Sequence, residues 1–373
     1  MGPLDGIKII EFSGLGPAPF CAMMLADMGA DVVCIKRPVG QAGSLDVGLG
    51  KHDILGRNRR VLHVDIKSAD GQKLLKKLIA KADGLIEGFR PGVMEKLGLG
   101  PDDCSKINKA LVFGRMTGWG QTGELSGQAG HDINYIASNG VLDMIGNAGE
   151  PLAVVAPPAV PPTLVGDMGG GAMFLAYGML AGIISAARTG EGQVVDAAII
   201  DGSALLSSVV WGIGGKYHWG ERGTNLLDGG AHFYGTYPCS DGKYISVGAL
   251  ELKFYQIFLD KLELADEIDQ NQQMNPQLWP ELKAKVAAVF ITMPRDHWAE
   301  LFAGSDACVF PVLSRDEAKT NAHMAARSVF VEVDGVTQPA PAPRFSKTPP
   351  EIKHMSGDDV ADIDSVLKSW EAL

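Results

Sequence analysis

The chain has 373 residues, which at about 150 residues per domain predicts two domains. It is 46% hydrophobic and 21% charged, so a folded core is expected and disorder or coiled coil is excluded. Lys and Arg number 33 against 44 Asp and Glu, giving a net charge of −11 that disfavours nucleic-acid binding. Any anionic ligand must therefore meet basic residues that are gathered locally.

Cysteine usage and the apolar stretches bear on the compartment. The five cysteines are scattered and form no C-x-x-C pair, which predicts neither a disulfide framework nor a zinc site. The start of the sequence lacks the pattern of a signal peptide, so we expect a cytoplasmic protein without a membrane partner. The uncharged stretch 168–187 is about long enough to span a bilayer, but its five glycines favour a buried core helix.

The first third of the sequence alternates short apolar runs with amphipathic segments. Repeated strand–helix units of this kind predict an α/β fold, with a parallel sheet covered by helices. The expected strands are 7–12, 30–35, 61–66, 85–86 and 111–116, and the expected helices are 19–28, a segment capped by Ser68, and 93–97.

The later segments predict a second, smaller unit. A proline-rich loop at 149–162 and a glycine-rich connection at 212–230 flank the helix at 168–187 and a strand at 194–200. Beyond them we expect strands at 244–247 and 309–313, helices at 251–264, 280–290 and 296–303, and an extended tail at 338–350. The predicted division is a large domain at 1–200, a linker at 201–235, a small α+β domain at 236–325 and a C-terminal segment at 326–373 that returns to the large domain.

The first strand–helix connection begins like a dinucleotide-binding motif, with Gly14 and Gly16 in the turn. Two features count against a nicotinamide enzyme. Pro19 stands where the third glycine is needed, and the second strand ends in Lys36-Arg37 instead of an acidic residue. A basic strand end of this kind suits NADP or another phosphorylated adenosine.

Basic residues recur around successive predicted strands, although each alone would pass as a solvated surface charge. Open α/β sheets bind ligands at the carboxyl ends of their strands. The recurrence therefore predicts an anionic, nucleotide-like ligand at one edge of the sheet; the residues are Lys36, Arg37, Arg57, Arg59, Arg60, Lys67, Arg90 and Lys96.

Two segments carry candidate acids and bases. His131 lies in the polar sequence Gly130 to Tyr135, although a His beside an Asp is more often structural. Asp167 directly precedes three glycines and the apolar helix, where Asp is a favoured N-cap. The glycines are not needed for capping, so we interpret them as exposing N–H donors to a developing oxyanion, with Asp167 as both cap and reactant.

Four motifs resemble the α-methylacyl-CoA racemases of the family III CoA-transferase superfamily. They are G-H-D-I-N-Y at 130–135, G-D-M-G-G-G at 166–171, R-M-T-G-W-G-Q-T-G at 115–123 and V-G-A-L-E at 247–251. The resemblance covers nearly the whole chain. It implies an interlocked homodimer with a Rossmann-like large domain and a small domain, whose active sites lie between the large domain of one subunit and the small domain of the other.

The resemblance also implies the chemistry and the residues. Inversion at C2 of a 2-methylacyl-CoA needs an acid/base group on each face of an enolate, and His131 and Asp167 match that pair, with Glu251 orienting the histidine. No separate cofactor and no metal are expected, because CoA is part of the substrate. The backbone at 168–170 is the candidate oxyanion donor. The matching CoA-binding positions are Arg37, Val64, Asp65, Ile66, Lys67, Gly88, Phe89, Arg90, Lys96, Gly130, Asp132, Ile133, Asn134 and Tyr135.

Three departures from the family pattern stand out. Thr163 occupies a position where relatives usually carry Asn, and the loop at 149–162 is longer than usual; both bear on substrate preference. Lys96 replaces a more usual Arg, which keeps the charge and loses the bidentate fork.

Three functions follow as hypotheses. The leading one is a 2-methylacyl-CoA racemase or epimerase of lipid and fatty acid metabolism. A CoA-transferase of the same superfamily would use Asp167 as an acyl-accepting nucleophile and has no need of a base at His131. A CoA-binding protein that retains the scaffold would bind thioesters without turnover.

Overall fold

A computed structural model describes residues 2–38, 49–149, 156–217, 219–355 and 360–372. Its contacts divide the chain into one unit of residues 1–139, 162–207 and 323–373 and a second unit of 140–161 and 208–322. The chain thus enters the second unit twice, whereas a single passage at 236–325 was predicted. Arg222 explains the difference, since it donates to Asp143 Oδ1 at 2.6 Å and to the carbonyl of Ala156 and so holds the first passage.

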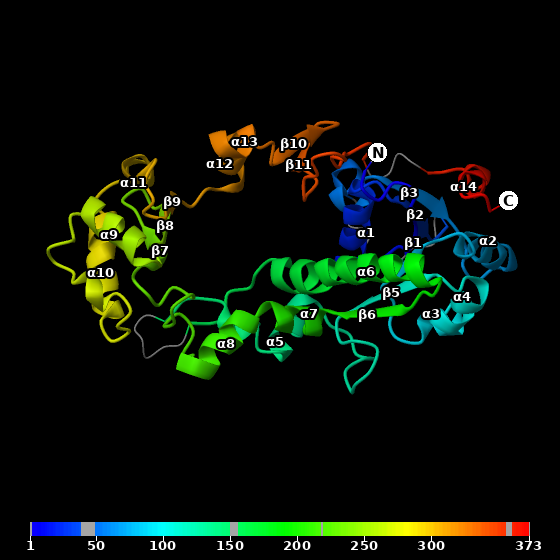
Figure 1. Ribbon diagram of the computed structural model, residues 1–373, viewed down its shortest axis with the longest axis horizontal. Helices are drawn as coiled ribbons and strands as arrows, with labels where there is room; N and C mark the ends of the chain where they lie inside the picture. Colours follow the sequence, from blue (N-terminus) through cyan, green and yellow to red (C-terminus); the bar gives the residue numbers. More distant parts are fainter. Residues whose placement is uncertain (1, 39–48, 150–155, 218, 356–359, 373) are drawn as a thin grey trace. The chain divides into compact units, whose positions relative to one another are not determined.

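The first unit is built on a six-stranded parallel sheet in the order β3-β2-β1-β4-β5-β6 (Figure 1). This is the strand order of Rossmann folds, whose ligands bind where the order reverses, here between β1 and β4. The α/β prediction is confirmed. The strands are β1 (Lys8–Phe12), β2 (Asp31–Lys36), β3 (Arg59–His63), β4 (Gly84–Glu87), β5 (Val112–Thr117) and β6 (Val194–Ala198).

Two groups of helices cover the sheet. One core contains residues of α1 and α6, and the other contains residues of α2, α3, α4 and α14, so the buried strands pack on both faces. Of the helices in this unit, α4, α5, α7 and α14 were not predicted, because they are short and lack a long apolar period. The bounds are α1 (Pro17–Asp27), α2 (Ala69–Ile79), α3 (Val93–Lys96), α4 (Pro101–Ile107), α5 (Asp132–Ser138), α6 (Met173–Thr189), α7 (Ile199–Leu206) and α14 (Ile363–Ser369).

The helix predicted at 168–187 differs from the expectation in shape and burial. It begins with a π-helical segment, Leu164–Ala172, which continues into α6. By length and composition alone, the combined stretch 164–189 is long and apolar enough to cross a membrane. In this structure, 44% of its most apolar window is buried. Leu175 and Met179 pack on the sheet, while Tyr177 and Ile184 are exposed, so the prediction of a buried helix is correct for one face only.

The second unit is a small α+β module. Its antiparallel sheet has the order β7-β8-β9, and aromatic side chains, among them Phe233, Tyr255, Phe258 and Phe290, fill its core. The glycine-rich connection predicted at 212–230 begins inside a helix, α8. The elements are α8 (Ser208–Tyr217), β7 (Tyr234–Pro238), β8 (Tyr244–Gly248), α9 (Leu252–Lys261), α10 (Trp279–Phe290), α11 (Arg295–Phe302), β9 (Val309–Pro311) and α12 (Arg315–Thr320).

The C-terminal segment belongs to the first unit. After α13 (Ala322–Ala326) it forms the hairpin β10 (Phe330–Val333) and β11 (Val336–Pro339), and an extended stretch then leads toward α14. Gln338 Oε1 accepts from Arg57, and Trp370 Nε1 donates to Asp31 Oδ2 at 2.8 Å. These polar contacts join the tail to β2 and to the residues just before β3.

Candidate active site

His131 and Asp132 begin helix α5 in the first unit. The His131 N–H donates to Asn134 Oδ1 at 3.0 Å, which satisfies one orphan donor at the helix start. The His131 side chain is exposed, whereas that of Asp132 is buried. This arrangement leaves the imidazole accessible to a ligand while the neighbouring carboxylate points into the protein.

Asp167 lies within the π-helical segment Leu164–Ala172. π-Helical segments are rare in proteins, and those that occur are often found at functional sites. Asp132 Oδ1 accepts the Asp167 N–H at 2.7 Å, so α5 contacts the π-helical segment at Asp167 through the residue that follows His131. The predicted pair, His131 and Asp167, is thereby brought together in one unit.

The pKa of the Asp167 carboxyl lies closer to neutral pH than that of an ordinary Asp. Its pKa is raised to about 6, mainly by burial and then by the negative charge of Asp132, while the nearby His131 acts in the opposite direction. A carboxyl with such a pKa exists in both protonation states near neutral pH. A group of this kind can both remove and return a proton.

Glycines allow the backbone to approach these carboxylates. A Cβ on Gly166 would lie 2.3 Å from Asp132 Oδ1, and one on Gly16 would lie 2.9 Å from Asp167 Oδ2. Gly16 has a φ of 67°, which places the β1–α1 turn against Asp167. Gly16 is thus a residue of the site that reasoning from the sequence missed; its turn had been read only as a weak nucleotide-binding motif.

We expect Gly166→Ala to lower the rate of the proton transfer for which Asp167 is a candidate by about 10- to 100-fold, the loss typical when a contact that supports a reacting group is disturbed. The added methyl would displace the buried Asp132 carboxylate from the Asp167 N–H. Gly127→Ala is the matched control, because nothing lies within 4 Å of a Cβ there. Initial rates with the substrate that the resemblance implies check the prediction, and equal rates for the two variants would contradict it.

The structure gives the glycine run after Asp167 a packing role that the sequence did not indicate, and it removes Met168 from the candidate oxyanion donors. The Met168 N–H already donates to the carbonyl of Thr163 at 3.0 Å. A Cβ on Gly170 would lie 2.6 Å from the backbone nitrogen of Ser203 in α7, and one on Gly171 would lie 3.0 Å from the side chain of Ile199. Gly170 and Gly171 therefore permit close helix packing, and Met168 is not a free oxyanion donor.

Thr163 immediately precedes the π-helical segment and has a φ of 54°. This left-handed conformation is unfavourable for a β-branched residue and is tolerated by Asn, the residue that the family resemblance implies at this position. The loop predicted at 149–162 lies in part outside the described residues, since 150–155 are not described.

Tyr135 closes the other side of α5. Its ring packs edge-on against Trp119 at 4.8 Å, and its hydroxyl donates to the carbonyl of Gly130. The pKa of the hydroxyl is raised by burial and by Asp167 and lowered by Arg90. Arg90, at the carboxyl end of β4, is thus within electrostatic reach of the same site, as expected for a ligand that spans both.

Other predicted CoA-binding residues are exposed, one directly after a strand and two on helices. Arg37 and Lys96 are exposed after β2 and within α3, and Ile133 is exposed on α5. The strand predicted at 61–66 ends at His63; residues 64–67 instead form a turn in which the Ser68 N–H donates to Asp65 O at 3.1 Å and Ser68 caps α2.

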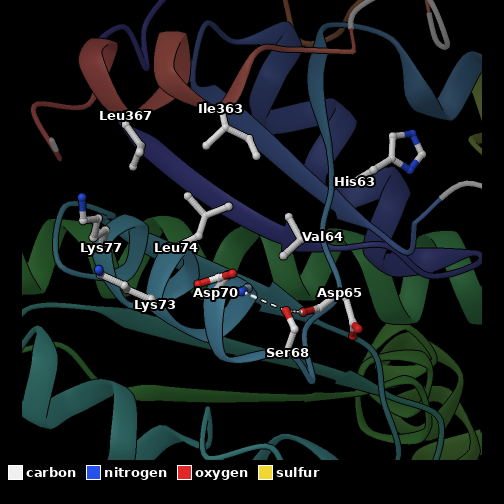
Figure 2. A pocket seen from close by; sticks show the side chains of 11 residues that line it. His63, Val64, Asp65, Ser68, Asp70, Lys73, Leu74, Lys77, Ile363 and Leu367 are labelled. Atoms are coloured by element: carbon white, nitrogen blue, oxygen red, sulfur yellow. Dashed lines mark hydrogen bonds between the residues drawn. The ribbon is translucent and has the colours of Figure 1, made fainter.

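A cavity of about 370 Å³ lies beside this turn, between α2 and α14 (Figure 2). Figure 2 shows Val64 and Asp65 at one end and Ile363 and Leu367 on the opposite wall. Neither His131 nor Asp167 is among its lining residues. The cavity is therefore lined by two predicted CoA-binding positions and by neither of the two candidate catalytic residues.

Three of the predicted basic residues do not face a ligand. Arg57 is buried against Asp27, Arg59 is buried against Glu11, and Arg60 pairs with Asp31, and all three lie at or just before the start of β3. That end is opposite to the ligand-binding edge of a parallel sheet. The basic edge thus reduces to Lys36, Arg37, Lys67, Arg90 and Lys96.

Glu251 lies in the second unit, where it is the exposed N-cap of α9. Among the described residues, no group of three or more His, Cys, Asp or Glu is arranged to hold a metal ion.

The fold and these residues define a Rossmann-type protein with a histidine and a weakly acidic carboxyl at one edge. The family model described as CoA-transferase family III matches residues 4–356, and the chain belongs to this family. It is 42% identical to alpha-methylacyl-CoA racemase of Mus musculus over 93% of the chain and 87% of the relative, and equally identical to the Homo sapiens protein with the same coverage. A CAIB/BAIF family protein from Brucella suis has the same fold, with a TM-score of 0.81, 23% identity and 99% coverage of both chains.

Proposed function

We propose that this protein is a racemase that inverts C2 of 2-methyl-branched acyl-CoA thioesters. The observation that carries the proposal is the contact that joins Asp132, beside His131, to Asp167, whose pKa of about 6 suits proton transfer in both directions. The 42% identity to two alpha-methylacyl-CoA racemases supports the same reaction.

The mechanism is a 1,1-proton transfer through an enolate. One member of the His131–Asp167 pair removes the C2 proton, and the other delivers a proton to the opposite face. For one epimer Asp167 acts as the ionised base and His131 as the acid; for the other epimer the roles are reversed, because both protonation states of Asp167 are accessible near neutral pH. No separate cofactor or metal is required.

Heavy water provides the test. A single epimer of a 2-methylacyl-CoA, incubated with the protein in heavy water, is expected to yield the other epimer with deuterium at C2. Recovery of the starting epimer without deuterium would refute the proposal. A panel of acyl chains from short branched acids to sterol side chains would then identify the preferred substrate.

The alternative within the family is CoA transfer through an anhydride at Asp167. The family description supports it, since it names CoA-transferases. In that reaction the Asp167 carboxylate attacks the thioester carbonyl, the C–S bond breaks and CoA thiolate leaves. Hydroxylamine would convert the anhydride to a hydroxamate at Asp167, so trapping with a donor thioester and no C2 exchange would favour transfer.

We further propose a homodimer in the cytoplasm, with Glu251 of one subunit orienting His131 of another. The exposed apolar side chains of the first unit support an interface between copies, among them Met173, Tyr177, Ile184, Leu205 and Leu206. Sedimentation velocity tests the dimer. Co-expression of His131→Ala with Glu251→Gln tests the shared site, because a mixed dimer would regain one intact site, whereas sites made within single chains would stay inactive.

A further inference from the structure

The segment after β4 contains four of the predicted CoA-binding residues. Gly88, Phe89 and Arg90 follow Glu87 directly, and Lys96 follows Glu95 in α3. Loop backbones of this kind are mobile unless contacts fix them. What holds this segment in place therefore bears on how well CoA binds.

One guanidinium, that of Arg115 on β5, connects both sides of the segment. Its Nε donates to Glu87 Oε1 at 2.9 Å, its Nη1 to Glu95 Oε1 at 2.7 Å and its Nη2 to Glu95 Oε2 at 3.3 Å. Because Glu87 and Glu95 flank residues 88–94, Arg115 closes that loop as a clamp. A lysine offers a single ammonium and cannot span both carboxylates in this forked geometry.

The second oxygen of Glu87 extends the clamp into the loop. Glu87 Oε2 accepts the Phe89 N–H at 2.7 Å, beside the predicted ligand Arg90. Glu87 is fully buried and Arg115 is 6% exposed, so each charge depends on the other for its pairing. The loop backbone is thus fixed by a buried ion pair that lies beneath it.

We propose that Arg115, acting through Glu87 and Glu95, is a positioning residue that sets the 88–96 segment for the CoA moiety. This deepens the proposed function and rests on it only for the identity of the ligand. Arg115 does not itself meet the substrate. Its effect is on affinity for CoA more than on proton transfer, since His131 and Asp167 are held by separate contacts.

Arg115→Lys tests the inference with CoA as the probe. The dissociation constant for CoA, measured by calorimetry, and KM for the thioester are both expected to rise about tenfold, the effect of losing one charge-assisted hydrogen bond. The value of kcat is expected to fall less than twofold. Amide hydrogen exchange in 88–96 is expected to quicken, because the loop loses its clamp.

Val112→Ala is the matched control, since Val112 is buried on the same strand and pairs with Gly84, whereas Arg115 pairs with Glu87. It is expected to lower the melting temperature while CoA affinity and exchange in 88–96 stay as in the wild type. Glu95→Gln, at an exposed carboxylate, is expected to raise the dissociation constant by about threefold and keeps the test available if Arg115→Lys does not fold.

Two results would overturn the inference. One is wild-type affinity for CoA in Arg115→Lys, or in Glu95→Gln if the first variant does not fold. The other is an equal loss of CoA affinity in Val112→Ala, which would mean that the effect of Arg115 comes from the general stability of the fold and not from the clamp. If the wild type binds CoA but exchanges no C2 proton, the proposed function fails while the clamp stands.

Discussion

Asp167→Asn is expected to lower racemisation by about 10³-fold, within the range for loss of a positioned acid or base. The amide has the shape of the carboxyl and leaves the Asp132 contact to the backbone N–H intact. It can neither take nor give a proton at the relevant pH. The measurement is the rate of epimer interconversion, starting from each epimer separately.

Deuterium exchange distinguishes the faces served by the two groups. In Asp167→Asn we expect residual exchange from only one epimer, the one whose C2 proton faces His131. In His131→Ala the opposite epimer is expected to exchange, through Asp167. Neither variant should interconvert the epimers at an appreciable rate.

Binding provides the control for these variants. Both are expected to bind CoA with near wild-type affinity, because the basic residues predicted to meet its phosphates, among them Arg37 and Arg90, lie outside α5 and the π-helical segment. A single-base mechanism would be indicated if one variant lost exchange from both epimers while the other variant kept exchange from both. Retained racemisation in Asp167→Asn would contradict the assignment of Asp167 as a reactant.

The parallel sheet was predictable because each strand is a short, continuous apolar run, and β1, β2, β4 and β5 were placed within about two residues. Strand ends were less secure. Val64 and Ile66 continue the apolar pattern past the end of β3. Asp65 and Ser68 nevertheless form a turn there, which this pattern does not reveal. The first passage of the second unit was missed because it depends on Arg222, a contact between distant parts of the sequence.

The charged residues show a similar limit. The arginines around the start of β3 were predicted to meet an anionic ligand, but their carboxylate partners, Asp27, Glu11 and Asp31, come from earlier segments. A sequence shows where charges occur and not which of them neutralise each other. The glycines after Asp167 had the same ambiguity, because helix packing and ligand approach both require the absence of a Cβ.

Asp132→Asn is expected to shift the acid limb of the pH–rate profile to lower pH. The Asp132 charge is the second cause, after burial, of the raised pKa of Asp167. An Asn Oδ1 can still accept the Asp167 N–H, so the substitution removes the charge and keeps the hydrogen bond. The pKa of Asp167 therefore falls from about 6 toward its ordinary value, although burial keeps it above that value.

The sign follows from the proton count of the pair. The enzyme works with one proton shared between His131 and Asp167, whichever epimer it accepts, so activity falls when a second proton binds at low pH. A lower pKa for Asp167 delays that second protonation. The variant should thus retain activity at acid pH values where the wild type has lost most of its own.

The profile of kcat/KM between pH 4.5 and 8, taken in both directions, is the measurement, with steps of about half a unit to resolve the limb. Asp132→Ala is the comparison, because it removes both charge and hydrogen bond and is expected to lower the rate at every pH. An acid limb that stays in place in Asp132→Asn would mean that another group controls it. A shift in both directions of the reaction, by the same amount, is the expected result, since one shared proton serves both epimers.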